Sequence, residues 1–382
     1  MYDPKGRSHE VPDRILFLAF ILAFLLSSIL RGTQAERTNE EEVRIFQEQV
    51  EKATAGTKVP GIVIAVREPD GRTFEAAVGK SDILDNKPMR TENSFYIGSI
   101  SQSMLAAIAF QMEEEGKLKL EDPISRFLEF PGGDNVTVEM LMDNSSGFGD
   151  WTGVDLRSTG NPKLPELLKS PQDMDSLIKI AADAEPGFQP GERQEGCYTN
   201  LLLLSKLIAY IEGKPATEVI QERIFKPLGM KNTRYLGIRE TLDSLAKGYR
   251  AEEGWGGRTG QELTEVSWAD KNLRGLAELG IVSDAKDVIK YHVGLRSGRL
   301  ISETSFQRMR CVRPGKLNGL GYQISKGPRG TWEGNNGHAV GHLSVSYYHV
   351  EKDFYIVVMG NLGDTALPVA RFFDLRYKDS RE

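Results

Sequence analysis

A serine at the start of an apolar helix is the first candidate for chemistry in this chain. Ser99 follows the short segment FYIG and precedes a run with helical spacing that ends at Gly116. A side chain at the amino terminus of a helix lies near free backbone N–H groups and the positive end of the helix dipole. Such N–H groups can stabilise an oxyanion during acyl transfer. Serine is also common as a plain N-cap, so this segment by itself leaves both roles open.

Six further segments follow Ser99 in one particular order. They are EMLMDNSSGF (139–148), FQPGERQEGCYTN (188–200), IFKPLGMKNTRY (224–235), GIVSDAKDV (280–288), GLGY (319–322) and NGHAVGHLS (336–344). With the Ser99 segment, this order resembles the penicillin-recognising serine hydrolases, specifically the class C β-lactamase and D-alanyl-D-alanine carboxypeptidase-like family. The resemblance covers roughly residues 40–375. It implies three motifs that line one cleft.

The first motif of that family is Ser-x-x-Lys, in which the serine is the nucleophile and the lysine accepts its proton. The matching residues are Ser99 and Gln102, so a glutamine occupies the lysine position. A glutamine side chain can hold a hydroxyl by a hydrogen bond but cannot accept a proton at neutral pH. Loss of a general base costs about 10²–10⁴ in rate. The resemblance therefore predicts an acyl-enzyme at Ser99 with impaired or altered activity.

The second motif of the family is Tyr-x-Asn, which Tyr198-Thr199-Asn200 matches fully. The resemblance implies that Tyr198 helps to move protons and that Asn200 binds the substrate amide. A further departure lies in the DNSSGF segment, where Asn144 and Ser145 occupy the positions of a family histidine and threonine.

The third motif is Lys-Thr-Gly or His-Thr-Gly on a strand. We match it to His342-Leu343-Ser344, which agrees only in its first residue. The backbone N–H of Val345 would then pair with that of Ser99 as an oxyanion hole. Because side chains alternate along a strand, His342 and Ser344 share one face, and we expect that face to line the cleft and bind substrate.

Two hypotheses of function follow. In the first, Ser99 attacks an amide or ester bond of a small molecule or peptide, Tyr198 acts as base, and His342 lowers the pKa of the tyrosine or binds a substrate carboxylate. In the second, the chain is a catalytically silent family member that keeps the cleft to bind a peptidoglycan-like peptide or a partner protein. The retained Ser99, Tyr198 and Asn200 favour the first hypothesis, whereas Gln102 and Ser344 favour the second. The motifs do not separate β-lactamase, carboxypeptidase, esterase and D-aminopeptidase activities.

Composition excludes several other classes of protein. The 382 residues include 48 basic and 54 acidic side chains, and no basic tract is dense enough for nucleic-acid binding. Two cysteines, Cys197 and Cys311, are too few for a disulfide framework or a four-thiolate zinc site, although one bridge between them stays open. We therefore expect no metal and no cofactor. The sequence does not fix the oligomeric state.

The candidate residues need a scaffold, and the ends of the chain supply its strands. The runs at 61–66 and 72–79 are typical of a hairpin, since Asp70-Gly71 separates them. Strand-like runs return at 319–325, 343–350 and 354–361, and helical spacing occurs at 40–54 and from about 365. These patterns predict an α+β fold, an α/β/α sandwich with a mainly antiparallel sheet built from both termini. A helical region, about 117–275, is inserted in this core.

The amino terminus differs from the rest of the chain. Residues 15–30 form an uncharged apolar run, and small residues follow it at Thr33 and Ala35. This pattern predicts that residues 1–35 are a signal peptide or a membrane anchor. Residues 36–382 would then form one serine-hydrolase domain that is exported to the periplasm or outside the cell, with membrane contact only through the amino-terminal segment.

Overall fold

The computed structural model describes residues 39–152, 170–171, 173–237, 240–251, 263–267, 280–339, 341–363 and 369–377. The chain divides into two units, Met1–Ile45 and Phe46–Glu382, and the first contributes only the start of one helix to the described residues. The predicted signal or anchor segment lies outside the described residues and remains a prediction. No helix in the described ranges has both the length and the apolar character needed to cross a membrane.

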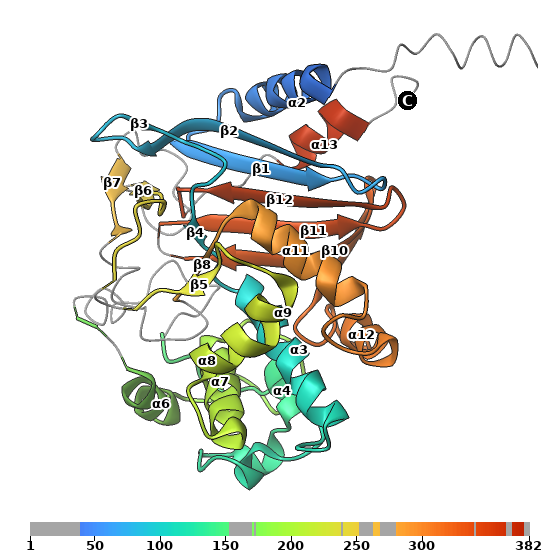
Figure 1. Cartoon of the computed structure of the whole chain (residues 1–382). Coiled ribbons are helices and arrows are strands. Elements are labelled where there is room, and N and C mark those ends of the chain that lie inside the picture. Colours follow the sequence, from blue (N-terminus) through green and yellow to red (C-terminus); the bar gives the residue numbers. More distant parts are fainter. Residues whose placement is uncertain are drawn as a thin grey trace, which may run out of the picture. The chain divides into compact units, whose positions relative to one another are not determined.

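The helices and strands are labelled in Figure 1. The helices are α2 (Asn39–Thr54), α3 (Ile100–Glu114), α4 (Val138–Met142), α6 (Met174–Ala182), α7 (Tyr198–Glu212), α8 (Ala216–Ile220), α9 (Lys226–Leu228), α11 (Ala285–Arg296), α12 (Glu303–Arg310) and α13 (Val369–Tyr377), with short helical turns at Ile124–Arg126, Gly133–Asn135 and Gln221–Phe225. The strands are β1 (Gly61–Arg67), β2 (Thr73–Asp82), β3 (Lys87–Pro88), β4 (Phe95–Tyr96), β5 (Arg234–Tyr235), β6 (Tyr249–Ala251), β7 (Leu263–Glu265), β8 (Ile281–Ser283), β9 (Gln323–Gly327), β10 (Gly330–His338), β11 (Leu343–His349) and β12 (Phe354–Gly360).

An antiparallel sheet in the order β3-β2-β1-β12-β11-β10-β9 forms the centre of the second unit. The β1–β2 hairpin turns at Gly71, whose φ of 89° favours glycine. Strand β1 also pairs with β12, so that Ile62 lies opposite Gly360. The two ends of the chain therefore build one sheet, which confirms the predicted α+β fold class.

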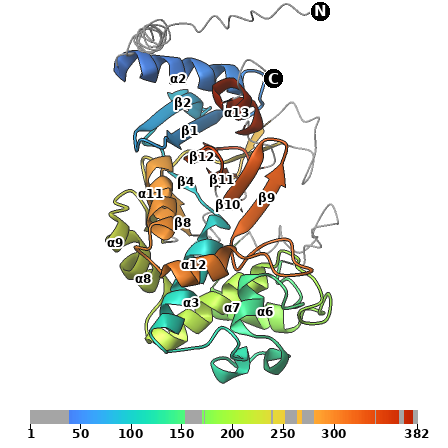
Figure 2. The same cartoon turned by 90° about the vertical axis from the view of Figure 1, so that its right-hand side faces the viewer.

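Helices cover both faces of this sheet (Figures 1 and 2). On one face, Phe46 and Val50 of α2 and Phe372 of α13 pack on outward-facing strand residues such as Ile64 and Val358. On the other face, α3 and α11 pack on the alternate residues of the same strands. The period-2 alternation of β1 thus places apolar side chains in two cores, which explains why this strand is buried along almost its whole length.

Strand β10 is the element that the sequence patterns do not predict. Its residues, GTWEGNNGH, include three glycines and lack an alternating apolar pattern. It nevertheless pairs with β9 on one side and β11 on the other. Pairing with two neighbours, rather than intrinsic strand propensity, holds this segment in the sheet.

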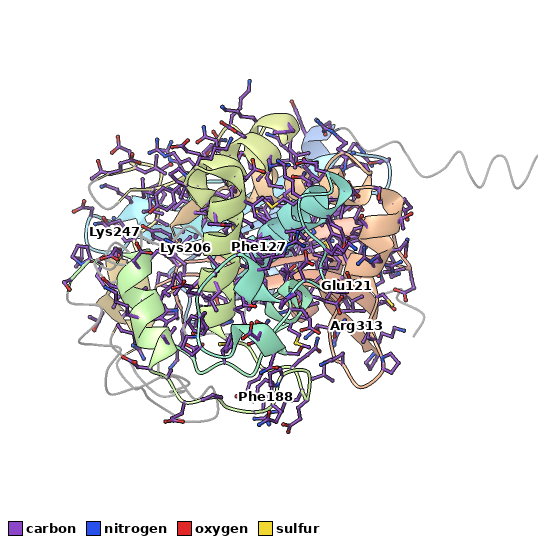
Figure 3. The ribbon with its side chains drawn as sticks, turned by 90° about the horizontal axis from the view of Figure 1, so that it is seen from below. Glu121, Phe127, Phe188, Lys206, Lys247 and Arg313 are labelled. Carbon is purple, nitrogen blue, oxygen red and sulfur yellow. The ribbon has the colours of Figure 1, made fainter. Side chains whose placement is uncertain are left out.

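Helices α7 and α8 of the middle region contact α3, and Figure 3 shows this region from below. Helix α7 packs against α3, α4, α6 and α8. The predicted helical region at about 117–275 contains α4 and α6–α9, and it also contains the short strands β5, β6 and β7. Its boundaries as an insertion remain a prediction.

Candidate active site

Ser99 lies where a short strand turns into helix α3. Strand β4 pairs with β8, and the N–H of Ile97 donates to the carbonyl of Ile281 at 3.1 Å, which fixes the approach to the helix. Ser99 is the N-cap residue of α3, yet its side chain makes no capping hydrogen bond. The side chain is half-buried. Its hydroxyl is therefore available for chemistry, and the plain N-cap role does not describe it.

Gln102 lies one helical turn after Ser99 and is buried. Its Nε2 donates to the backbone carbonyl of Met142 at 3.1 Å. The side chain is thereby tied to the end of α4. At the lysine position of the first motif, the structure thus has a neutral side chain, and one of its two N–H donors is bonded to Met142.

The strand beside Ser99 is β10. An ideal Cβ on Gly337 would lie 1.8 Å from the carbonyl oxygen of Ile97 and 3.2 Å from the N–H nitrogen of Ile100. A Cβ on Gly98 would lie 2.3 Å from the carbonyl oxygen of His338. Only glycine at positions 98 and 337 allows the two backbones to approach this closely. This contact identifies Gly337-His338 as the strand segment next to the nucleophile candidate.

The structure corrects the expected place of His342 and Ser344. Both side chains are fully buried. The Nε2 of His342 lies 3.0 Å from the carbonyl oxygen of Ala246, and its ring packs on Phe95 and Tyr96. Ser344 donates to the carbonyl of Tyr96 at 3.3 Å. The polar face of β11 therefore packs under β4 and does not line an open cleft.

Val345 also lies away from the candidate nucleophile. It pairs with Asn336 of β10 and Val358 of β12, so its backbone groups lie within the sheet ladder. Its side chain joins the core beneath α2 and α13. The oxyanion-hole role of Val345 remains a prediction.

Tyr198 is the first residue of α7, and its N–H donates to Oδ2 of Asp150 at 2.6 Å. Its ring packs against Trp151 with ring centroids 6.3 Å apart. Burial, followed by the negative charge of Asp150, raises the pKa of Tyr198 to about 12. The phenol is therefore neutral at pH 7. The expectation that His342 lowers this pKa is not met, because His342 contacts Phe95 and Tyr96 instead.

Asn200 is the third residue of α7 and is fully buried. Its Oδ1 accepts from the hydroxyl of Ser146 at 2.6 Å, and its Nδ2 donates to Oδ1 of Asn144 at 3.1 Å. Both ends of the carboxamide thus hold the loop that follows α4. The contact of Asn200 with a substrate amide remains a prediction, since the NH₂ group and the oxygen can each form one further hydrogen bond.

Comparison with known proteins decides the family. A family model described as beta-lactamase matches residues 45–373, most of the chain. This chain belongs to the β-lactamase family. The resemblance to this family, inferred from Ser99 and the six ordered segments, is therefore confirmed.

Curated relatives of this β-lactamase-family chain have several names. It is similar to the putative penicillin-binding protein PbpX of Bacillus subtilis, with 29% identity over 249 residues that cover 64% of this chain and 56% of the relative. It is also similar to a D-aminopeptidase of Brucella anthropi, with 24% identity over 234 residues that cover 61% of this chain and 42% of the relative. The chain thus spans about half the length of the curated relatives that it matches.

Solved structures share the fold of this β-lactamase-family chain. The D-amino acid amidase from Ochrobactrum anthropi SV3, solved with L-phenylalanine amide, matches with a TM-score of 0.73 and 23% identity over 89% of this chain and 100% of that one. A penicillin-binding protein from Bacillus halodurans matches with a TM-score of 0.72 and 19% identity over 84% of this chain and 97% of that one. At such identities, the likeness establishes the fold alone.

The match of the third motif to His342-Leu343-Ser344 remains a prediction, and a second possible match lies on β10, beside the Ser99 segment. Asn335-Asn336-Gly337 keeps the glycine of Lys-Thr-Gly, and that glycine makes the close approach to the Ser99 segment. Asn335 and Asn336 replace the cationic residue and the threonine. The retained glycine was the signal in the sequence that could have located this motif, because a strand glycine often marks a close backbone approach.

Next to Gln102, the structure has a cavity of about 150 Å³. The residues that line it come from α3, the end of α4 and the loop after it, the segment before α7, the loop before β9, and β10: Gln102, Met142, Asp143, Asn144, Gln194, Glu195, Gly196, Leu317, Asn318, Gly319, Gly321, Tyr322, Gln323 and Asn335. Many of these residues carry carboxamides, and none is basic. The altered motif positions 102 and 335 thus share one polar cavity.

The remaining expectations concern metals and cysteines. Among the described residues, no group of three or more His, Cys, Asp or Glu side chains could hold a metal ion. Cys197 and Cys311 are both free thiols, so the bridge that the sequence left open is not formed. Burial raises the pKa of the Cys197 thiol to about 12, which makes it a poor nucleophile at neutral pH.

Proposed function

We propose that this chain is a slow serine hydrolase that cleaves amide bonds through an acyl-enzyme at Ser99. The observation that carries the proposal is the position of Ser99 at the amino terminus of α3, half-buried, with a side chain that makes no capping hydrogen bond. In the reaction, the Oγ of Ser99 forms a bond to the substrate carbonyl carbon, the C–N bond breaks, and the proton of the hydroxyl ends on the leaving amine. Water then hydrolyses the ester.

The low rate follows from the groups around the nucleophile. Gln102 cannot accept the proton, and its amide donates to Met142. Tyr198 is a neutral phenol at pH 7 because its pKa is raised to about 12. Absence of a general base lowers the rate by about 10²–10⁴. We therefore infer that acylation is slow compared with an enzyme that has the family lysine.

The names of the relatives support an amide of a D-amino acid as the substrate class. They include a D-aminopeptidase among the curated relatives and a D-amino acid amidase among the solved structures. Esters and β-lactams are further substrates of the same chemistry, since each also forms an acyl-enzyme with a serine.

A covalent label tests the nucleophile. Fluorophosphonate or fluorescent penicillin should label the wild-type protein slowly, and Ser99→Ala should lose the label. Ser101→Ala is the matched control on the same helix, because the hydroxyl of Ser101 already donates to the carbonyl of Gly98 at 2.8 Å. Labelling that persists in Ser99→Ala would contradict the proposed nucleophile.

A second candidate function is a binding protein without catalysis, which takes a peptidoglycan-like peptide or a partner protein in the same region. The neutral side chains at positions 102 and 335 favour it, since both lie where the family motifs have groups that handle protons or charge. Absence of any label after long incubation, together with labelling of Gln102→Lys, would favour this second function over the first.

We also propose that the chain is exported through residues 1–35. The support is the uncharged apolar run at 15–30, followed by small residues at 33 and 35. Amino-terminal sequencing of the protein from the external fraction should find a start near residue 36 if the segment is cleaved. An intact amino terminus in a membrane fraction would indicate an anchor, and an intact protein in the cytoplasm would contradict export.

A further inference from the structure

The cavity next to Gln102 contains a buried hydrogen-bond acceptor without a partner, the Oδ1 of Asn335, and the buried hydroxyl of Tyr322 on its wall has no partner either. Asn335 donates its Nδ2 to the carbonyl of Gly321 at 3.1 Å, and Gln102 donates its Nε2 to the carbonyl of Met142 at 3.1 Å. A backbone carbonyl can only accept, so the NH₂ group of each carboxamide must face it. This fixes the orientation of both side chains and leaves their oxygens for other donors.

The oxygen of the Asn335 carboxamide is the unusual feature. Asn335 is 1% exposed, and its Oδ1 has no hydrogen-bond partner. Buried acceptors are normally satisfied, so an unpaired one on a cavity wall indicates that a ligand or water donates to it. A ligand that satisfies this acceptor therefore has to offer an N–H or O–H donor.

The charges around the cavity favour a neutral group. No Lys or Arg is among the described residues that line it. The two acidic lining residues already have cationic partners outside the lining: Asp143 pairs with Arg313, which Figure 3 labels, and Glu195 pairs with Arg193 at 3.2 Å. A carboxylate would find no cation in this cavity, and an ammonium group would find no unpaired anion.

The wall opposite the two oxygens is held in place by Gln194. Its Oε1 accepts from the N–H groups of Leu317 at 2.6 Å and Asn318 at 3.0 Å, and its Nε2 donates to the carbonyl of Asn318 at 3.2 Å. The loop before β9 is thus fixed against the segment before α7. A site whose walls are held before binding loses less conformational entropy when a ligand enters.

We propose that this cavity binds a primary carboxamide of the ligand, with its N–H groups donated to the Oδ1 of Asn335 and the Oε1 of Gln102. A carboxamide is neutral, offers two N–H donors, and is small enough for about 150 Å³. The inference rests on the proposed function in one respect. The bound carboxamide would lie next to Gln102, one helical turn from the proposed nucleophile Ser99. Gln102 is then a specificity-determining residue that reads the amide of the ligand.

Binding to the Ser99→Ala protein tests this inference without turnover. The probes are N-acetyl-D-alaninamide, its methyl ester analogue, which lacks the terminal N–H groups, its free acid, and N-acetylethylenediamine as a cationic amine. Calorimetry or NMR titration should find the amide bound about tenfold more tightly than each of the other three. Equal or tighter binding of the ester, the acid or the amine would overturn the inference.

Two variants locate the site in the Ser99→Ala background. Asn335→Leu and Gln102→Leu each remove one acceptor and should weaken amide binding about tenfold without weakening ester binding. Thr331→Val is the matched control, because Thr331 also lies on β10 and does not line the cavity. If one leucine variant fails to fold, the other still tests the site. An equal loss in Thr331→Val, or no loss in the folded acceptor variants, would contradict it.

The two proposals can fail separately. A protein that prefers the amide but never reacts with the covalent label keeps the carboxamide site and loses Ser99 as the nucleophile. A protein that is labelled at Ser99 but binds all four probes alike keeps the nucleophile and loses the carboxamide site.

Discussion

Strands β10 and β11 are neighbours in one sheet, yet their polar side chains have different surroundings. Ser344 of β11 and His342, the residue before this strand, are fully buried and each contacts a backbone carbonyl, whereas the Oγ of the buried Ser346 has no partner. On β10, Asn335 is equally buried, but its Oδ1 has no partner and the residue lines a cavity. Burial alone therefore does not distinguish a structural polar residue from one that is free to bind.

The difference arises from what covers each strand. The polar face of β11 lies under Phe95 and Tyr96 of β4, which fill the space above it. Strand β10 instead passes beside the start of α3, where Gly98 and Gly337 allow contact between backbones. The strand closest to the candidate nucleophile is thus the one with glycine at the crossing, and the predictions below test this assignment.

The largest effect should come from restoring the family residues on the β10 side. Gln102→Lys combined with Asn335→His supplies a base and a titratable group near Ser99, and we expect labelling to accelerate about 10²-fold or more. The matched pair Gln102→Lys with Ser344→Gly alters β11 instead and should label no faster than Gln102→Lys alone. Equal acceleration in both double variants would contradict the assignment of the third motif to β10.

A methyl group at the crossing should have the next largest effect. Gly337→Ala would place Cβ against the carbonyl oxygen of Ile97, and we expect a loss of about 3 kcal/mol or more in the free energy of unfolding. Urea denaturation measures it. Gly327→Ala on β9 is the control, because no atom lies within 4 Å of its ideal Cβ. Similar stability of the two variants would mean that β10 does not touch the Ser99 segment.

The surroundings of two buried histidines also differ, and this difference predicts how the free energy of unfolding depends on pH. His342 contacts a carbonyl, whereas both ring nitrogens of His292 are buried without a partner, next to Tyr322 on the cavity side. Burial, and then the charge of Arg296, lowers the pKa of His292 to about 3. Below about pH 6.5, the unfolded chain therefore binds a proton that the folded protein does not, and stability falls until about pH 3.

The expected loss from His292 between pH 7 and pH 5 is about 2 kcal/mol in the free energy of unfolding. Denaturation at the two pH values measures it, and His292→Phe should remove most of the difference. His338→Gln, at an exposed histidine, should leave the difference in place. A wild-type protein that is equally stable at both pH values would contradict a neutral, buried His292.

The smallest effect should come from the hydroxyl on β11. Ser344→Ala removes a hydrogen bond of 3.3 Å to Tyr96, and we expect a loss of about 1 kcal/mol or less with no change in the rate of labelling. Thermal or urea unfolding and the covalent label measure the two quantities. A marked fall in labelling, with stability retained, would show that Ser344 acts in the site after all.

The sequence by itself determined the elements whose signals are local. The hairpin at Asp70-Gly71, the apolar runs of β1 and β12, and the helical run after Ser99 are set by neighbouring residues, and each formed as predicted. The ordered segments also indicated the family. Such a match depends only on residue types and their order along the chain. The presence of Gln102 at the family lysine position could also be recognised from the sequence alone.

Only the tertiary structure decided which strand lies beside Ser99 and which amides share a cavity. Strand β10 has no strong propensity of its own and exists because β9 and β11 pair with it. The cavity brings together Gln102 and Asn335, which are far apart in the chain, and the Oδ1 of Asn335 has no partner there. Hydrogen-bond satisfaction depends on every neighbour in space, so no pattern within one segment could predict it.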